Sequence, residues 1–497
     1  MIKKNFFRKV ALGIGPNEKI PSEPVSWAQN QVDKVPSVIW DEPIRTGEEM
    51  LNYYAEWVYT DREILRKKHK GNRKAYDDAK NSLRNKVGER YFENLEICIR
   101  HNTVLNSGAP VFERLWLFWC NHFAIIDKDF MPEFTTGPYH RETIRKNMCG
   151  SFETLLKEAT LGWSMIHNLD NSESIGPSSE WGQNRTQRGK LATVNENHAR
   201  ELLELHSVGP AAGYYQKEVV SLSYIMCGWE CPWTKKRSRA NPVKFNHDKH
   251  QPGYHKVFGK TYKQRGLTSK NKLLDIIEDL ATHPSCISFI THKLCRHFIC
   301  DHPTEEMMKP IIKAWHDSNG DLPTIHKALL KVAYEYTGIY AKLQNPEVWL
   351  LQMATMADLS WPVALKDMEY NFSTKPTKHM QRVKWDLEEI GLQPYRPTQP
   401  NGWSDLSADW ISPELLLRRI VFAKKFSLVG KDAYGRGFGP KNWSPVHMLK
   451  SNFDELDEVL KYLTLDKPNW ESDPKAKELH PYNVVQTLFP SKWMVLA

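Results

Sequence analysis

The chain has 497 residues, of which 40% are hydrophobic and 26% charged, the balance of a globular protein. This length suits roughly two to four ordinary domains or one large one. The net charge of +9 is a mild basic excess that permits anionic partners without specifying one. No run approaches the ~18 apolar residues that a membrane span requires, so we predict no membrane span.

Eight cysteines in a chain of this length do not make a disulfide framework. Cys227 and Cys231 are four apart, which is not the spacing of a Cys-x-x-Cys zinc site. The N-terminus is basic, but the apolar stretch at residues 10–14 is too short for the hydrophobic region of a signal peptide. We therefore expect a cytoplasmic protein. A truncated or processed N-terminus would instead make a periplasmic or extracellular one.

Helical periodicity dominates the sequence in chain order. An amphipathic run begins near residue 46, and residues 61–90 carry alternating charges typical of a solvated helix pair. Pro110 opens a strongly apolar helix. The helices predicted from there on cover residues 111–126, 194–208, 216–227, 270–299 and 311–340.

Residues 233–266 lack this periodicity and are rich in Lys, Arg, His and Gly, which predicts a short irregular or β excursion. The fold class that we predict is mainly α. A main helical domain would cover residues 1–345, and a helical part over residues 346–497 would pack on it; the two can also be one continuous domain.

The most informative helix follows Asn195. At 100° per residue, Asn197, Glu201 and Glu204 share one face. Two carboxylates three residues apart on one helical face can bind a metal ion or act as general acid and base. This stretch therefore predicts a functional site.

The same stretch also fits a structural interpretation. Thr193 and Glu196 match the Thr-x-x-Glu capping box, in which two side chains close the start of a helix. Glu196 and Arg200 are i,i+4 partners, which stabilises a solvated helix modestly. The spacing alone leaves the choice between a site and a capped helix open.

Two other strings offer polar groups. His122 follows Asn121 on the apolar helix and falls on its buried face, where a histidine can be a ligand or a satisfied core residue. His247 and Asp248 lie in the non-helical stretch, where such a pair can bind metal, transfer protons or shape a turn. The basic residues 235–244 suit either nucleic acid or a solvated loop.

Taken in order, these segments resemble the bacterial domain-of-unknown-function 1800 family. The matching strings cover nearly the whole chain: residues 11–16, 118–123, 139–145, 150–152, 169–171, 195–206, 228–229, 245–248 with Lys256 and Gly259, 283–284, and 392–403 with Trp410. The resemblance implies a mostly helical protein with no established reaction. It also implies export in many members and, as a partner, a protein of the domain-of-unknown-function 1501 family. The family often has a polar residue such as His where this chain has Cys120, so no ligand role is carried over to that position.

Because polar strings far apart in the sequence recur together in this family, we predict that they share one pocket. The leading hypothesis is an enzyme, hydrolytic or metal-assisted, with a carboxylate–histidine site and possibly a divalent metal ion. The predicted catalytic residues are Arg200, Glu201, Glu204, His247 and Asp248. The predicted binding residues are Asn121, Asn195, Glu196 and Asn197. The predicted metal ligands are His122, Glu201, Glu204, His206 and His247.

The alternative hypothesis is a non-catalytic scaffold or assembly partner whose polar cluster is a buried structural network. Nucleic-acid binding is the third hypothesis. An open pocket with convergent unpaired groups would favour the enzyme, and a closed set of paired groups would favour the scaffold.

Overall fold

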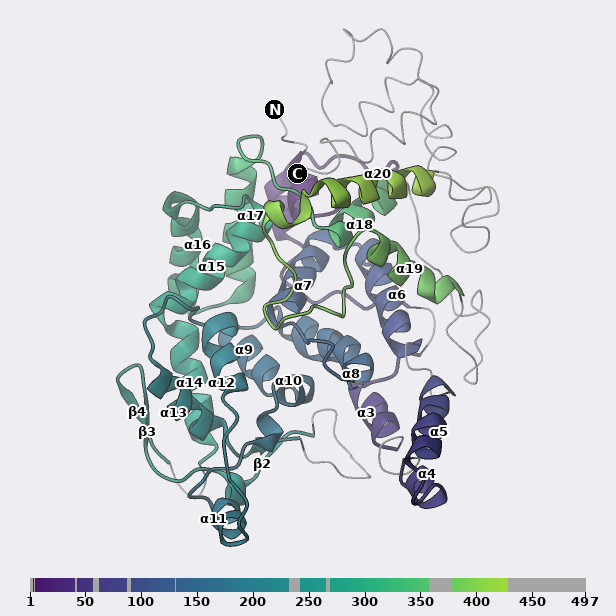
Figure 1. The fold of residues 1–497 in the computed structure, drawn as a ribbon. Coiled ribbons are helices and arrows are strands. Elements are labelled where there is room, and N and C mark those ends of the chain that lie inside the picture. The colour runs from purple at the N-terminus through teal and green to yellow at the C-terminus, as the bar shows by residue number, and fades with distance from the viewer. Residues whose placement is uncertain are drawn as a thin grey trace.

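The structure is a computed structural model that describes residues 3, 5–40, 43–56, 62–86, 91–129, 131–231, 242–264, 269–356 and 378–427. Helices make up most of it, so the predicted mainly α fold class is confirmed (Figure 1). In this part of the chain the strands form two small antiparallel pairs. No helix in it is long and apolar enough to cross a membrane.

The first part of the chain forms eight helices and a π-helical turn, η2. Their bounds are α1 Asn5–Val10, α2 Pro24–Gln29, α3 Gly47–Glu56, α4 Arg62–Lys68, α5 Arg73–Lys86, α6 Tyr91–Asn106, α7 Pro110–His122, α8 Pro132–Pro138 and η2 Tyr139–Arg145. The predicted solvated pair within residues 61–90 corresponds to α4 and α5, which pack on each other.

The middle of the chain alternates short helices with the strands. These elements are α9 Phe152–Thr160, α10 Trp163–Asn168, η3 Asn171–Glu173, α11 Glu180–Gln187, α12 Asn197–Glu201, the π-helical turn η4 Leu202–His206, α13 Gln216–Met226, β1 Trp229–Glu230, β2 Lys244–Phe245, η5 His247–Lys249, β3 His255–Val257 and β4 Lys260–Tyr262.

The remaining elements are helical. They are α14 Asn271–Thr282, α15 Pro284–Phe298, α16 Glu305–Ser318, α17 Leu322–Tyr336, α18 Pro346–Met356, α19 Lys378–Glu389, the short 3-10 helix η7 Ser407–Trp410 and α20 Pro413–Ser427. The helical run predicted over residues 270–299 consists of two helices, because His283 is extended and Pro284 starts α15. The run predicted over residues 311–340 is likewise two, since Asn319 adopts a left-handed conformation that ends α16.

Helix α7 lies at the centre of the fold, as its apolar sequence predicts (Figure 1). Its tryptophans are fully buried, and each indole N–H must therefore find an acceptor. Trp116 Nε1 donates to the His140 carbonyl oxygen at 2.9 Å, and Trp119 Nε1 donates to His326 Nε2 at 3.1 Å. These bonds tie α7 to η2 and α17.

A buried ion pair adds a third connection from α7. Glu113 has no exposed surface and Arg145 only 1%. The Arg145 guanidinium donates to both Glu113 carboxylate oxygens, at 2.5 and 2.7 Å, and lies 4.6 Å from the centre of the Trp116 ring. A bidentate pair of this kind fixes both distance and orientation between α7 and η2.

The non-helical excursion predicted over residues 233–266 is confirmed: the strands lie between residues 229 and 262, although residues 232–241 and 265–268 are outside the described part. β1 pairs with β2 and β3 with β4, and β3 packs on α13. Residues 174–176 bridge this excursion to the segment before α12. Ile175 N donates to Thr193 O at 3.0 Å, and Gly176 N donates to Lys249 O at 2.9 Å.

The segment after residue 345 packs on the main helices. Helices α18 and α19 both contact α6. Between α19 and η7, residues 392–407 run without regular structure over the end of α7; we call this segment the strap. The predicted domain boundary near residue 345 stays a prediction.

The buried ion pair gives a test of the fold. We expect Glu113→Gln to lower the free energy of unfolding by about 3–5 kcal/mol, because it leaves the buried Arg145 guanidinium without a counter-charge. Denaturant titration followed by circular dichroism measures this change. The matched control is Asp317→Asn, which removes the same charge from an exposed pair with Lys313 and should cost less than about 1 kcal/mol. Equal effects of the two variants would contradict the argument.

Candidate functional site

The Asn195 string begins with a turn stabilised by its own side chain. Asn195 Oδ1 accepts from Asn197 N at 2.9 Å, and Asn195 N donates to Ser174 Oγ at 2.9 Å. The predicted capping box of Thr193 and Glu196 was wrong: Glu196 precedes the helix and makes no side-chain cap. The Asn195 amide takes over the local role that the capping box was expected to perform.

A half-exposed ionic network follows on α12. Arg200 Nη2 lies 3.3 Å from Glu196 Oε2, and Arg200 Nη1 lies 3.3 Å from Glu204 Oε1. Gln216 joins them by accepting from Arg200 at 2.8 Å and donating to Glu196 at 2.6 Å. The structure thus brings together three of the predicted residues, and the predicted i,i+4 pair of Glu196 and Arg200 is present.

The two predicted catalytic carboxylates lie in different environments. Glu204 contacts Arg200, and burial together with the nearby Glu204 carboxylate raises the pKa of Tyr214 to about 12. Glu201 has no hydrogen bond or ion pair within the described residues, and burial and the Glu204 charge raise its pKa. Neighbouring carboxyl groups with unlike surroundings are typical of an acid–base pair. Tyr214 was missed because it lies in a loop beyond the helix.

An open groove of about 420 Å³ adjoins this network. It is lined by Glu173, Thr193, Val194, Asn195 and Glu196. Glu196 belongs to both the groove and the network on α12, so the predicted binding residues Asn195 and Glu196 do face an accessible hollow. Asn197 starts α12 and is half-buried.

On the opposite side, α12 and η4 bury a cluster of imidazoles against α7 and α15. His122 Nε2 donates to the His206 carbonyl oxygen at 3.3 Å, and its Nδ1 accepts from Lys293 Nζ at 2.9 Å. The rings of His122 and His206 are 6.1 Å apart. Burial lowers the pKa of Lys293 to about 8, and that of His122 falls well below its usual value for the same reason.

The structure places His247 and Asp248 away from these groups. Both side chains are exposed on η5, which packs on α11. Asn246 Oδ1 accepts from Asp248 N at 3.1 Å, the turn-shaping interpretation that the sequence left open. No hydrogen bond or ion pair among the described residues links either side chain to α12. In the same part of the chain, no three His, Cys, Asp or Glu side chains are placed to hold a metal ion.

Asn121, another predicted binding residue, anchors the strap. Its amide donates to the Trp403 carbonyl oxygen at 2.8 Å and accepts from Trp403 N at 2.8 Å. Gly402 is required beside it, because a Cβ there would lie 2.4 Å from the Asn121 carbonyl oxygen. Asn121 therefore fastens two segments that are 282 residues apart.

A partly enclosed polar cavity lies between α7 and the strap. Its free volume of about 20 Å³ fits one water molecule. Its polar wall includes Arg100, Asn121, Thr136, His140, His297 and Glu347, and the strap contributes Leu392, Pro394, Pro397 and Trp403. Three buried atoms of lining residues, Thr136 Oγ1, His140 Nε2 and His297 Nε2, have no partner among the described residues.

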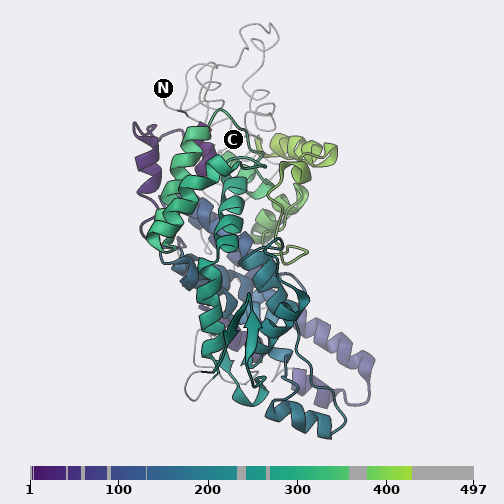
Figure 2. The ribbon, with the colours of Figure 1, turned by 90° about the vertical axis from the view of Figure 1, so that its left-hand side faces the viewer.

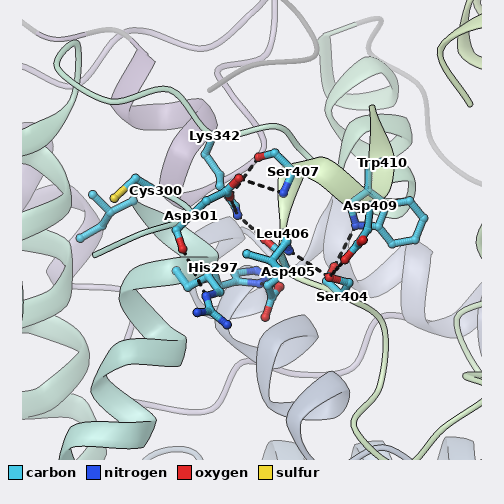
Figure 3. Close-up of polar contacts among 12 residues, drawn as sticks. His297, Cys300, Asp301, Lys342, Ser404, Asp405, Leu406, Ser407, Asp409 and Trp410 are labelled. Atoms are coloured by element: carbon cyan, nitrogen blue, oxygen red, sulfur yellow. Dashed lines mark hydrogen bonds and ion pairs between the residues drawn. The ribbon is translucent and has the colours of Figure 1, made fainter. Parts of the chain in front are cut away.

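His297 and Asp405 form a dyad at this cavity (Figure 3). His297 Nδ1 lies 2.6 Å from Asp405 Oδ1. Burial lowers the pKa of His297, which favours its neutral form, while burial raises the pKa of Asp405, and His297 and nearby lysines lower it on balance. The carboxylate can only accept, so Nδ1 carries the proton and Nε2 is a free acceptor.

His140 presents the complementary group. The Arg100 guanidinium, which only donates, lies 3.4 Å from His140 Nδ1, so His140 Nε2 carries the proton and can donate. Arg100 itself is held by two 2.9 Å bonds to Glu347, whose pKa that neighbour lowers to about 2 despite burial. The cavity thus combines an imidazole acceptor and an imidazole donor.

Further contacts hold the strap beside the dyad. Asp301 accepts from Ser407 N and Ser407 Oγ, both at 3.0 Å. Lys342 contacts both the Asp301 carboxylate and the Asp405 carbonyl oxygen (Figure 3). Arg396 also binds Glu93 through two bonds of 2.6 and 2.7 Å. Asp405 is therefore positioned by contacts on both sides of it along the chain.

The sequence profile of the family described as "Protein of unknown function (DUF1800)" matches residues 15–487. The chain belongs to this family, which confirms the resemblance found in the sequence. No curated protein and no solved structure matches it. In the fold, the family strings at residues 118–123, 139–145 and 392–403 all contribute lining residues to the polar cavity.

The unpaired carboxyl group gives a test on α12. A raised pKa means that folding favours the protonated form of Glu201, so stability is lost as pH rises through the folded pKa. We expect Glu201→Gln to leave the melting temperature unchanged or raised at pH 7.5, with the gain shrinking near pH 4. Glu204→Gln is the control: it weakens contacts with Arg200 and Tyr214 and should lower the melting temperature slightly. A sharp fall for Glu201→Gln alone would show a structural role.

The buried imidazoles give a test of pH dependence. Burial lowers the pKa of His198, His206 and His326 to about 3, so between about pH 6.5 and 3 only the unfolded state takes up their protons. The free energy of unfolding should therefore decrease as pH is lowered, by up to about 1.4 kcal/mol per pH unit for each imidazole. His198→Leu should reduce this slope by the contribution of one imidazole, as measured by denaturant titrations at several pH values. An unchanged slope would contradict the assignment.

Proposed function

We propose that the chain is a hydrolytic enzyme whose general base is His297, oriented by Asp405 in the cavity beneath the strap. The observation that carries this proposal is the dyad itself. A partly buried carboxylate fixes the tautomer of a neutral imidazole and leaves its other nitrogen free at a water-sized cavity. The same relation between carboxylate and imidazole supports general-base catalysis in hydrolases.

The chemistry follows from the two tautomers. A water in the cavity donates one proton to His297 Nε2 while its oxygen forms a bond to the electrophilic atom of the substrate. Asp405 stabilises the imidazolium that results. His140 Nε2–H donates a hydrogen bond to the oxygen that gains negative charge, and the imidazolium returns its proton to the leaving group. The substrate meets this water at the strap wall, where Asn121 and Trp403 lie.

A second location for the reaction is the open groove beside α12. It is favoured by one specific observation: Glu201 is an unpaired, half-buried carboxyl group with a raised pKa, next to a carboxylate that is paired. There Glu201 would be the general acid, and Glu204 and Arg200 would position the substrate. The predicted metal-binding role of His122, His206, His247 and the two carboxylates stays a prediction, which metal analysis of the purified protein tests.

Two expectations from the sequence, a partner implied by the family resemblance and a compartment judged from the N-terminus, remain part of the proposal. One is a partner protein of the domain-of-unknown-function 1501 family, which co-purification from a common expression host tests. The other is residence in the cytoplasm, with export as its alternative, which cell fractionation tests. Nucleic-acid binding stays the third hypothesis.

Substitutions distinguish the two locations. Hydrolysis would be followed with a panel of chromogenic esters, amides, glycosides and phosphate esters between pH 5 and 9. If the dyad is catalytic, His297→Gln and Asp405→Asn should each lower kcat/KM by at least about 100-fold, the usual contribution of a general base. Glu201→Gln and Glu204→Gln should then retain activity and serve as matched controls.

Loss of activity in the Glu201 and Glu204 variants, with activity retained in the His297 and Asp405 variants, would assign the reaction to the groove. Each variant's melting temperature must be measured alongside, so that unfolding is not mistaken for loss of chemistry. If the parent protein hydrolyses nothing in the panel while His297→Gln or Asp405→Asn lowers its melting temperature sharply, the cavity is a structural network and the scaffold hypothesis is favoured.

A further inference from the structure

Helices α4 and α5 form an arm that carries much of the net charge of the molecule. Residues 62–82 contain eight Lys and Arg against three Asp and Glu, a net charge of +5 out of +9 for the whole chain. The remaining 476 residues thus share only +4. No side chain of α4 is buried, so the arm adds little to the core.

The cations gather at the end of the arm. Residues 66–74, which join α4 to α5, hold six cations and no acid, and all six are exposed: Arg66, Lys67, Lys68, Lys70, Arg73 and Lys74. We call these residues the basic tip. The turn is well defined, because Asn72 Oδ1 accepts from Ala75 N at 3.0 Å and Gly71 has a φ of +85°.

Half of these charges have no internal partner. Lys67 pairs with Glu63 at 3.1 Å, Arg73 lies 3.8 Å from Asp77, and Arg66 lies near Tyr76, where it helps to lower the pKa of the hydroxyl. Among the described residues, the other three cations of the tip form no ion pair: Lys68, Lys70 and Lys74. Holding like charges together in this way opposes compaction, so the arrangement points to an anionic partner.

The shape of the arm favours contact through its end. It projects from the body in both views, and no other helix flanks the tip (Figures 1 and 2). Farther along α5, Asp77 and Asp78 interrupt the positive surface. A nucleic-acid duplex lying along α5 would bring its phosphates against these carboxylates, whereas a flat anionic layer meets the tip alone. Ile64, 57% exposed on α4, can enter the headgroup region beside it.

We propose that the basic tip docks the protein on an anionic phospholipid surface. The attraction is electrostatic, with the lysine ammonium groups lying among lipid phosphates and no helix inserted. Each cation near such a surface is worth about 1 kcal/mol, or roughly a five-fold factor in the binding constant. This docking is independent of the proposed hydrolysis, since the arm contributes no residue to the cavity or the groove.

Vesicle co-sedimentation tests the proposal. The full chain should bind vesicles of phosphatidylcholine with 30% phosphatidylglycerol, should not bind phosphatidylcholine alone, and should be released at about 1 M salt, where the screening length is about 3 Å. The triple variant Lys68→Gln, Lys70→Gln, Lys74→Gln should bind about 100-fold more weakly. The control, Lys309→Gln, Lys313→Gln, Lys331→Gln on α16 and α17, loses the same charge and should bind as the parent does.

The other outcomes overturn the proposal. Equal weakening of both triple variants would mean that only net charge matters. Equal binding to charged and neutral vesicles would exclude an electrostatic contact. Binding of a 20-base-pair duplex, lost in the arm variant, without binding to vesicles would assign the tip to nucleic acid. Since the arm lies outside the core, unchanged melting temperatures of both variants show that they are folded.

Discussion

Burial of α7 is the constraint on which the rest of the structure depends. The helix is apolar enough to occupy the centre, yet it carries polar groups that lose their water there. Each must be satisfied by a different neighbour, because an unpaired buried group costs about 1–3 kcal/mol. Glu113 therefore fixes η2, Trp119 fixes α17, Asn121 fixes the strap and His122 meets α15. These hydrogen bonds and the ion pair determine how the neighbouring elements are arranged around α7.

This arrangement explains why the cavity beside the strap is polar. Where α7, η2 and the strap meet, Arg100 and Glu347 satisfy each other, and the imidazoles of His140 and His297 each have one nitrogen bound and one free. A network with every atom paired would serve stability alone. The two nitrogens without a partner at a water-sized space, one a donor and one an acceptor, are what supports the proposed proton transfer. Groups that fall short of full pairing are a common feature of functional sites.

Local pattern was sufficient to predict the helical class, the solvated pair now seen as α4 and α5, the excursion and the family. It also predicted that Asn195 and Arg200 lie in one polar neighbourhood. It did not find the dyad, because His297 and Asp405 are 108 residues apart and no local motif marks either residue. The spacing of Thr193 and Glu196 suggested a capping box that does not form, since the Asn195 side chain closes the same turn. The spacing of residues within the sequence does not reveal which distant residues long-range packing brings together.

The strap has a consequence for synthesis. His297 is made long before Asp405, and at about 5–20 residues per second the interval between them is roughly 5 to 20 s. During that time α7 and α15 can already pack, while the wall that the strap provides is missing and the imidazole lacks its carboxylate. A nascent chain therefore carries a cavity without its strap wall, and on the proposed mechanism proton transfer would begin only once the strap has packed. The order of synthesis therefore delays assembly of the dyad until the strap has been made.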